Sequence, residues 1–578
     1  MKSNLKRQHY TDILEKIKTY FPSPVSNPIM DGYLIHTISH FLDHVDNLKC
    51  NAPILGIEQE CFESTIRCTD EETKSTRSKP EIGVEDLNFP EDMGSVESTT
   101  ELLVDYCKDM IVWAHPNSQA NVIPPSSISS ILAFIATAIY NPNIIEDEYS
   151  ARFAEAEIES IAMLSDLIGY DPQASGGLFT FGGTGTIFYG CKLGIEKIFN
   201  GRAMIEGIRE DVKIVASNSS HYSKLNVAGW LGIGTKNLVT IPTTHENEMS
   251  LIALEEYLRN AFDREEKIAT IIATLGTTDA FGIDDLTTIV RLRDKLTEEY
   301  QLEHPPHIHA DSVIGWSWAV FKDYDFKSNP LGFHSRTLRS LQDSLERMRS
   351  FHMADSLGID FHKTGYCPYI SSAFIVKNRK DLTLLSRAPE QMPYLYQFGY
   401  YHPGIYTLEC SRSGAGALAG LANIRLFGKQ GYRVLIGHVV EMSEMLRERL
   451  EAYPFIHVLN DYNYGPVTLF RVYPEEMDAK DTFRRELTDA NYREQLEKNN
   501  IYNRQIFNNI HKRAMHGDGV LLSWTDAYRH PDYSDFAPVG AIKSFILSPW
   551  TDLNAIDIVV RQVLEATKMN VNYSSQSE

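Results

Sequence analysis

Short apolar runs rich in β-branched residues alternate with helical segments through the middle of the chain, and this alternation most constrains the fold. The runs are apolar along most of their length, which predicts strands buried on both faces of a mostly parallel sheet. Helices between them would cover the sheet, as in α/β proteins. The runs are VKIVAS at 212, LVTIPT at 238, ATIIATLG at 269, HIHAD at 307, SLGIDF at 356 and AFIVK at 373.

The segments before and after these apolar runs differ from them in composition and in the spacing of apolar residues. The first two dozen residues carry apolar side chains at helical spacing and predict an amphipathic helix that ends near Pro22. Residues 60–100 are acidic and rich in Ser and Thr, which predicts a flexible insertion. After Ser411 come the apolar helix GAGALAGLANIRLFG, a helix around Val434 to Tyr453, and the strand-like VTLFRVYP and SFILSPW. We therefore expect an N-terminal helical and dimerisation segment, a large α/β domain and a smaller α/β domain, over residues 1–112, 113–410 and 411–578.

Composition narrows the class of protein. The net charge of -22 disfavours nucleic acid or an anionic membrane surface as a partner. The longest apolar stretch, Ile128 to Tyr140, is shorter than the roughly 20 residues of a membrane-spanning helix, so we expect a buried helix there. Seven scattered cysteines without a CxxC pair, and a charged N-terminus, indicate a soluble enzyme of a reducing compartment, the cytoplasm.

Functional groups of open α/β sheets gather where strands end at their carboxyl side. Here these places hold GGTGT at 182, HYSK at 221, Thr274, Asp311 and Lys363. GGTGT could be only a tight strand-to-helix turn. It could also hold a phosphate on the backbone N–H groups at a helix start, with the hydroxyl of Thr184 as a further donor. Neither the dinucleotide fingerprint nor the P-loop pattern is present, so a monophosphate fits best.

Two of these sites have competing interpretations. His307 and His309 share one face of their strand with Asp311, as the metal site of a hydrolase would require. The alternative is structural, with one histidine packed in the core and Asp311 capping a turn. Lys363 would ordinarily be a surface lysine. If it is desolvated, its neutral amine can condense with an aldehyde.

Together the sites match the needs of pyridoxal 5'-phosphate, which are an amine, a carboxylate for the ring nitrogen, a flat group against the ring and a phosphate cradle. Lys363 supplies the amine, Asp311 the carboxylate and His221 the flat ring. The phosphate would lie on Gly182, Gly183 and Thr184, with His362 as an additional donor.

The sequence resembles the group II pyridoxal-dependent decarboxylases, which include glutamate, aromatic amino-acid and tyrosine decarboxylases. The resemblance runs from about Trp113 to Tyr432. It is carried by GLFTFGGTGT, SHYSKLNVAGWLGIG, ATLGTTDAFGIDDL, HIHADSVIGW, ADSLGIDFHKTGYCPY and LECSRSGAGAL, which occur in the family's order. AHPNSQANVIPP, YNPNIIEDEYS and the GYCPY after Lys363 look closest to bacterial tyrosine decarboxylases.

The resemblance implies an aspartate-aminotransferase-like fold of type I and a homodimer with active sites at the subunit interface. The implied reaction is decarboxylation of an L-amino acid, tyrosine-like and aromatic, through a Schiff base and a quinonoid intermediate, releasing CO2 and the amine. The implied roles are Schiff-base lysine for Lys363, ring-stacking histidine for His221, ring-nitrogen partner for Asp311, proton donor for Tyr369, a place near the reacting cofactor for Thr274, and substrate approach for His115, Asn117 and Gln119.

Departures from the family's pattern leave alternatives open. Asp311-Ser312-Val313 stands where Asp-Ala-Ala is usual and brings Val313 to the ring; Gly185-Thr186 replaces Glu-Ala, and Phe361 replaces Pro. They leave open an aspartate or glutamate decarboxylase and a carbon–carbon lyase of the phosphosphingolipid-lyase type. A metal hydrolase using His307 and His309 is the alternative of another class, and a cofactor-free binding protein is a further one.

Overall fold

The computed structural model describes residues 2–56, 87–393, 395, 397–462, 465–533 and 537–574. The chain forms two compact units. The first comprises Met1–Ser118 and Asn508–Leu521, and the second comprises Gln119–Phe507 and Leu522–Glu578. The domain boundaries expected from the sequence at 112/113 and 410/411 stay predictions.

The first unit is helical. Its helices are α1 (Lys2–Lys18), α2 (Pro28–Asp46) and α4 (Val96–Asp105). The expected N-terminal helix is thus confirmed, and it ends shortly before Pro22. Asn27 caps α2, because its side-chain oxygen accepts the backbone N–H groups of Ile29 and Met30. The acidic segment predicted at 60–100 lies mostly outside the described residues, and its last residues begin α4.

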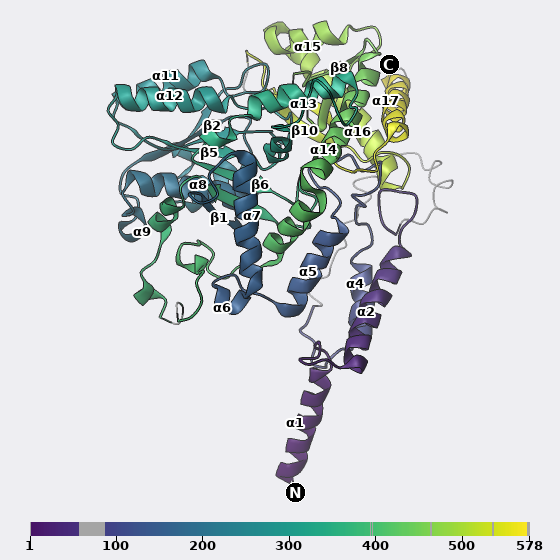
Figure 1. The fold of residues 1–578 in the computed structure, drawn as a ribbon. Helices are drawn as coiled ribbons and strands as arrows, with labels where there is room; N and C mark the ends of the chain where they lie inside the picture. The colour runs from purple at the N-terminus through teal and green to yellow at the C-terminus, as the bar shows by residue number, and fades with distance from the viewer. Residues whose placement is uncertain are drawn as a thin grey trace. The chain divides into compact units, whose positions relative to one another are not determined.

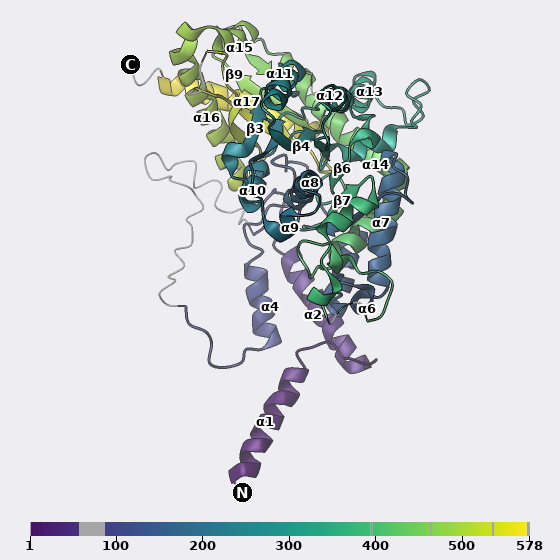
Figure 2. The ribbon, with the colours of Figure 1, turned by 90° about the vertical axis from the view of Figure 1, so that its left-hand side faces the viewer.

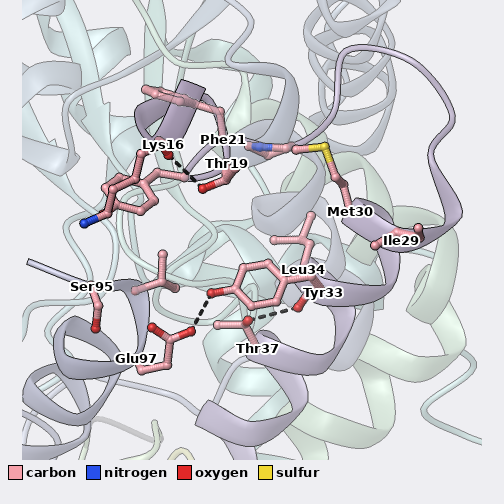
Figure 3. A pocket seen from close by; sticks show the side chains of 13 residues that line it. Lys16, Thr19, Phe21, Ile29, Met30, Tyr33, Leu34, Thr37, Ser95 and Glu97 are labelled. Atoms are coloured by element: carbon pink, nitrogen blue, oxygen red, sulfur yellow. Dashed lines mark hydrogen bonds between the residues drawn. The ribbon is translucent and has the colours of Figure 1, made fainter. Parts of the chain in front are cut away.

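A pocket of about 510 Å³ lies between α2, the start of α4 and the end of α1 (Figure 3). Much of its lining is apolar, with Phe21, Met30 and Leu34 among the contributors. The hydroxyl of Tyr33 donates to Glu97 Oε1 at 2.9 Å and so ties α2 to α4. The first unit therefore presents an apolar groove whose walls are held by a polar contact.

The second unit is built on a seven-stranded sheet of order β1-β7-β6-β5-β4-β2-β3. Pairs β6–β5–β4–β2–β3 are parallel, and β7 is antiparallel to both of its neighbours. All six strands expected from the apolar runs are present. The strands are β1 (Gly176–Thr180), β2 (Val212–Ser217), β3 (Leu238–Ile241), β4 (Lys267–Thr274), β5 (His307–Asp311), β6 (Ser356–Asp360) and β7 (Ser372–Val376).

Helices cover both faces of this sheet, as the uninterrupted apolar strands predict. Along β2, Ile214 and Ala216 pack with α8 (Gly183–Ile198) and α10 (Ser223–Trp230). Val215 belongs instead to the larger core on the other face. That core takes in α7 (Arg152–Ile168), α11 (Leu251–Asp263), α12 (Leu286–Glu299), α13 (Ser335–Met348) and α14 (Ala415–Glu451). Figure 1 shows α7 beside α14 in this layer.

Helix α14 joins two helices that the sequence predicts separately. It runs for 37 residues with a break at Gly428, whose φ of 51° and ψ of -169° are not helical. Glycine adopts such a conformation without the steric cost that a side chain would add. The apolar GAGALAGLANIRLFG and the helix expected around Val434 to Tyr453 therefore form one element with a kink between them.

Helix α5 (Ile128–Tyr140) has the expected bounds but not the expected burial. Its Ile128 and Tyr140 are 78% and 74% exposed, and only Ser130, Ala133 and Thr137 are buried. The prediction of a buried helix is wrong because the helix is apolar on more than one side, whereas α14 covers only one of them (Figure 1). The chain thus leaves an apolar helix face open.

A second, antiparallel sheet of order β10-β11-β9-β8 lies in the same unit. Its strands are β8 (Ile456–Val458), β9 (Val467–Val472), β10 (Ser523–Arg529) and β11 (Val539–Phe545). β9 confirms the strand expected at VTLFRVYP. β11 ends at Phe545, so the strand expected over SFILSPW lies mostly earlier in the chain. Helices α15 (Ala479–Thr488) and α17 (Leu553–Ser574) gather around this sheet (Figure 2).

The remaining elements are short, apart from α16 (Arg493–Met515), whose last part belongs to the first unit. They are α6 (Asp147–Ser150), α9 (Ala203–Glu206), η3 (Thr235–Asn237), η4 (Gly315–Phe321), η5 (Phe351–Met353), η6 (Arg379–Leu385), η7 (Pro389–Gln391), η8 (Pro403–Ile405) and η9 (Ala490–Tyr492). Within the described ranges, no helix has both the length and the apolar character that crossing a membrane requires.

Candidate active site

A pocket of about 240 Å³, which we call the inner pocket, lies where β5 and β6 end and α8 begins. It belongs wholly to the second unit. The structure brings together here most of the side chains that the sequence singled out: Gly182, Gly183, Thr184, His221, Asp311, Val313, His362, Lys363 and Tyr369. Residues far apart in the sequence therefore converge on one small volume.

Lys363 is held by a carboxylate that sequence reasoning missed. Its Nζ lies 2.9 Å from Asp360 Oδ2, and the Lys363 side chain is only 15% exposed. Ser372 donates its hydroxyl to Asp360 Oδ1 at 2.6 Å, which fixes the carboxyl group. Burial alone would raise the pKa of Asp360, but the charges of Lys363 and His362 outweigh burial and lower it. Asp360 thus stays ionised and positions the amine.

Asp311 ends β5 and has one carboxylate oxygen without a partner. It is 3% exposed, and its Oδ1 is buried with no hydrogen-bond partner. Burial raises its pKa to about 6, with a further contribution from Asp360, while the charge of Lys363 opposes the rise. A buried oxygen without a donor is costly, so the site fits a ligand that brings an N–H group to it.

Val313 and Ser312 follow Asp311 and point to different surroundings. The Ser312 hydroxyl donates to the Gly358 carbonyl at 2.7 Å and is buried against β6. Val313 lines the inner pocket, as the sequence predicts for the departure from Asp-Ala-Ala. Of these two departures, only the one at Val313 therefore bears on what the inner pocket holds.

His221 is a neutral ring in a fixed orientation. Burial, followed by the charge of Lys363, lowers its pKa to about 4. The backbone N–H of Ser223 donates to its Nδ1 at 3.2 Å, and the Ser223 hydroxyl is 2.9 Å from the same atom. Because Nδ1 accepts, the proton of the neutral ring lies on Nε2. The arrangement suits a flat ring that stacks on a ligand.

The turn from β1 into α8 is shaped for an anion. Gly182, the residue before α8, has a φ of 117°, which side chains rarely allow. A Cβ at Gly183 would lie 2.8 Å from Asp360 Oδ2, so only glycine leaves this space open. The first turn of α8 and Thr184 face the inner pocket, where a helix N-terminus favours a phosphate.

Tyr369 stands at the mouth of the inner pocket. Its side chain is half exposed, and its ring packs on that of His362 with centroids 4.1 Å apart. Its hydroxyl donates to the Val122 carbonyl at 3.4 Å. Burial, helped by the charge of Asp360, raises the pKa of Tyr369 to about 12. The phenol therefore keeps its proton at neutral pH and has one to give.

Other expected site residues are not gathered in the inner pocket. Thr274 pairs in register with Asp311, but it does not line the pocket, and its N–H donates to Asp284 at 2.7 Å. Gln119 is fully buried, and its Oε1 accepts the Ser544 hydroxyl. His115 and Asn117 belong to the first unit, where Asn117 donates to the Gly519 carbonyl. Their roles toward the substrate stay predictions.

The two histidines proposed as metal ligands lie inside the sheet. His307 Nε2 and His309 Nδ1 are 2.8 and 2.9 Å from the same Ser356 hydroxyl. Burial is the main cause that lowers the pKa of each to about 3. Among the described residues, no group of three or more His, Cys, Asp or Glu side chains could hold a metal ion. Their interpretation as core histidines fits this environment best.

Comparison with a buried lysine, Lys224, shows why Lys363 is the reactive candidate. Burial lowers the pKa of Lys224 to about 8, which is the property expected of a nucleophilic amine. Its ammonium, however, donates to Ser217 and Asn218 carbonyls and to both oxygens of Ser220. Lys224 does not line the inner pocket, so its amine serves the structure of the β2–α10 turn.

Comparison with known proteins identifies the class of enzyme. Residues 85–472, more than half of the chain, match the pyridoxal-dependent decarboxylase conserved domain, so the chain belongs to this family of pyridoxal-phosphate-dependent amino-acid carboxy-lyases. Membership confirms the resemblance drawn from the motifs. It also decides against the metal hydrolase as the class of enzyme.

Relatives within the family act on different substrates. The chain is 24% identical to the L-2,4-diaminobutyrate decarboxylase of Acinetobacter baumannii, over 67% of this chain and 72% of that one. It is 28% identical to the L-tyrosine decarboxylase of Enterococcus faecium, over 42% and 41% of the two chains. An acidic amino acid decarboxylase of Homo sapiens is 23% identical over 74% and 80%.

The fold is also that of known decarboxylases. A crystal structure of a glutamate decarboxylase domain from Vibrio parahaemolyticus superposes with a TM-score of 0.68 at 17% identity, covering 96% of this chain and 99% of that one. This likeness confirms the expected fold of type I, with its mostly parallel sheet.

The inner pocket fits pyridoxal 5'-phosphate. When bound, the cofactor supplies an aldehyde that forms an imine with an amine and a protonated ring that withdraws electrons from the substrate Cα. Lys363 offers the amine, and the orphaned Oδ1 of Asp311 can accept the ring N–H. The glycine turn before α8 leaves room for the phosphate, and neutral His221 is available to face the ring. Asp360 holds the amine before it reacts.

Proposed function

We propose that the protein decarboxylates an aromatic, tyrosine-like L-amino acid. The observation that carries this proposal is a cavity of about 860 Å³, the outer cavity, that shares His221 with the inner pocket. An amino acid whose Cα lies at the inner pocket could place a large side chain there. The motifs AHPNSQANVIPP and GYCPY, similar to those of tyrosine decarboxylases, support the same choice.

The proposed roles follow from the positions of the side chains. Lys363 would hold the cofactor through its amine, and the amine of the substrate would take its place. Asp311 would keep the ring nitrogen of the cofactor protonated, and the neutral ring of His221 would stack on that ring. Tyr369 delivers the proton to Cα after CO2 leaves, since its phenol stays protonated at neutral pH.

We further propose a homodimer that works in the cytoplasm. The open apolar side of α5 and the apolar groove of the first unit are the kinds of surface that a second copy covers. Sedimentation of the cofactor-loaded protein tests this, and a fully active monomer would contradict it.

Release of CO2 from each of the twenty amino acids, measured with the cofactor-loaded protein, tests the proposed substrate. We expect tyrosine or another aromatic amino acid to give the highest kcat/KM. A protein that prefers aspartate, glutamate or diaminobutyrate would overturn the aromatic assignment while leaving decarboxylation in place.

A further inference from the structure

The outer cavity contains an ion pair between a buried lysine and a half-exposed aspartate. Lys543, on β11, is 6% exposed, and its Nζ lies 2.7 Å from Asp279 Oδ1. The side chain of Asp279, on the loop after β4, is 45% exposed. Thr525 donates its hydroxyl to the other carboxylate oxygen at 3.1 Å. Both side chains line the outer cavity, the carboxylate of Asp279 is the more exposed of the two, and both of its oxygens are engaged.

A second strong cation of the cavity is committed to the protein's own oxygens. Arg529 Nη2 donates to the carbonyls of Thr244 and His245 and to Asn247 Oδ1, at 3.1, 2.9 and 2.8 Å. Its Nη1 lies 3.2 Å from His245 Nδ1. These contacts fasten the loop after β3 to β10. The guanidinium therefore stabilises the cavity wall through contacts within the protein.

We propose that Asp279 masks Lys543 and thereby excludes amino acids with acidic side chains from the outer cavity. The inference rests on the proposed function and names the specificity device of that site. Asp279 and His221 line the same cavity, so the carboxylate faces the space that a substrate side chain would occupy. In this proposal Asp279 determines substrate specificity and takes no part in the bond-breaking step.

The exclusion has a simple electrostatic cause. A substrate carboxylate entering the cavity would meet the half-exposed Asp279 first, and like charges in a partly desolvated site repel strongly. To bind Lys543 it would have to displace a carboxylate that Thr525 also holds. A phenol or another neutral side chain meets no such opposition. Discrimination of this kind uses an unfavourable contact with the wrong substrate.

The test is the ratio of kcat/KM for glutamate or aspartate to kcat/KM for tyrosine, measured for the cofactor-loaded protein. Every amino acid carries the same α-carboxylate, so the ratio isolates the side chain. Asp279→Asn removes the masking charge and keeps a hydrogen-bond acceptor for the buried ammonium. We expect the ratio to rise at least about tenfold. Asp279→Ser should raise it in the same direction.

Two controls separate unmasking from a general change of charge. Asp532 lines the same cavity and is exposed, and Asp532→Asn removes the same charge without touching the ion pair. It should leave the ratio within about twofold. Adding Lys543→Met to Asp279→Asn should abolish the gain, because no cation is left to receive the acidic side chain.

The outcomes distinguish this inference from the proposed function. If the wild-type protein releases no CO2 from any amino acid, the proposed function fails. If it decarboxylates tyrosine but Asp279→Asn and Asp279→Ser leave the ratio unchanged, masking fails while the function stands. An equal rise in Asp532→Asn, or a wild-type protein that already prefers acidic substrates, also overturns masking.

Discussion

The inner pocket and the outer cavity are built in different ways, although both are lined by His221. The inner pocket takes its key groups from the ends of β5 and β6 and the turn before α8, and its two carboxylates, Asp311 and Asp360, are buried. The outer cavity is assembled from loops after β2, β3 and β4 and from the second sheet, with several exposed side chains. Local rules of the sheet therefore place the groups of the inner pocket, whereas contacts between distant segments build the outer cavity.

The first prediction tests whether chemistry is confined to the inner pocket. Tyr369→Phe removes the proposed proton donor, and kcat should fall about 10²- to 10⁴-fold while the visible absorption of the bound cofactor is kept. Tyr366→Phe is the matched control, since this buried tyrosine lies in the same segment without lining the pocket. Its kcat should change by less than about threefold. Equal effects of the two variants would remove Tyr369 from the mechanism.

The second prediction concerns the cost of the inner pocket's buried charge. Folding raises the pKa of Asp311 from 3.8 to about 6. Between these pH values the folded protein therefore binds more protons than the unfolded chain. The free energy of unfolding consequently falls as pH rises from about 4 to about 6. Asp311→Asn should therefore stabilise the cofactor-free protein at pH 8 by about 1–3 kcal/mol, measured by urea unfolding. The gain should shrink as pH falls toward 5.

Asp360, in the same pocket, should affect the free energy of unfolding in the opposite direction. Its pKa is lowered, so its charged form contributes stability above its ordinary pKa, and this stability is lost only in acid. Asp360→Asn should therefore destabilise the cofactor-free protein at pH 8. Two variants that shift stability in the same direction would contradict the assigned electrostatics.

The third and smallest effect is expected at the boundary between the two regions. Ser223→Ala removes the hydroxyl next to His221 Nδ1 but keeps the backbone N–H that donates to it. We expect kcat/KM to fall about three- to tenfold with the cofactor still bound. Ser219→Ala, at an exposed residue of the outer cavity, is the control. A loss in Ser219→Ala as large as in Ser223→Ala would show that His221 is oriented by other means.

The same difference explains what the sequence could predict. Asp311 and Lys363 follow apolar runs directly, so a rule about strand ends finds them. Asp360 ends SLGID and obeys the same rule, but its contact with the Lys363 amine is not evident from the apolar pattern. The local signal for Asp360 was thus present in the sequence.

No local sequence pattern predicts the residues that line the outer cavity. Asp279 and Lys543 are separated by 264 positions and meet only because β11 and the loop after β4 come together. The exposed apolar side of α5 could not be predicted from the sequence either. An apolar helix is predicted to be buried whether the chain itself or a second copy covers it. Spacing along the chain does not report such long-range contacts.

The most direct test of the account is the site of cofactor attachment. The purified, cofactor-loaded protein is reduced with borohydride, digested and analysed by mass spectrometry. We predict a phosphopyridoxyl group on the peptide that contains Lys363, and none after Lys363→Ala. Attachment to Lys224 or another lysine, or a protein that takes up no cofactor, would contradict the account.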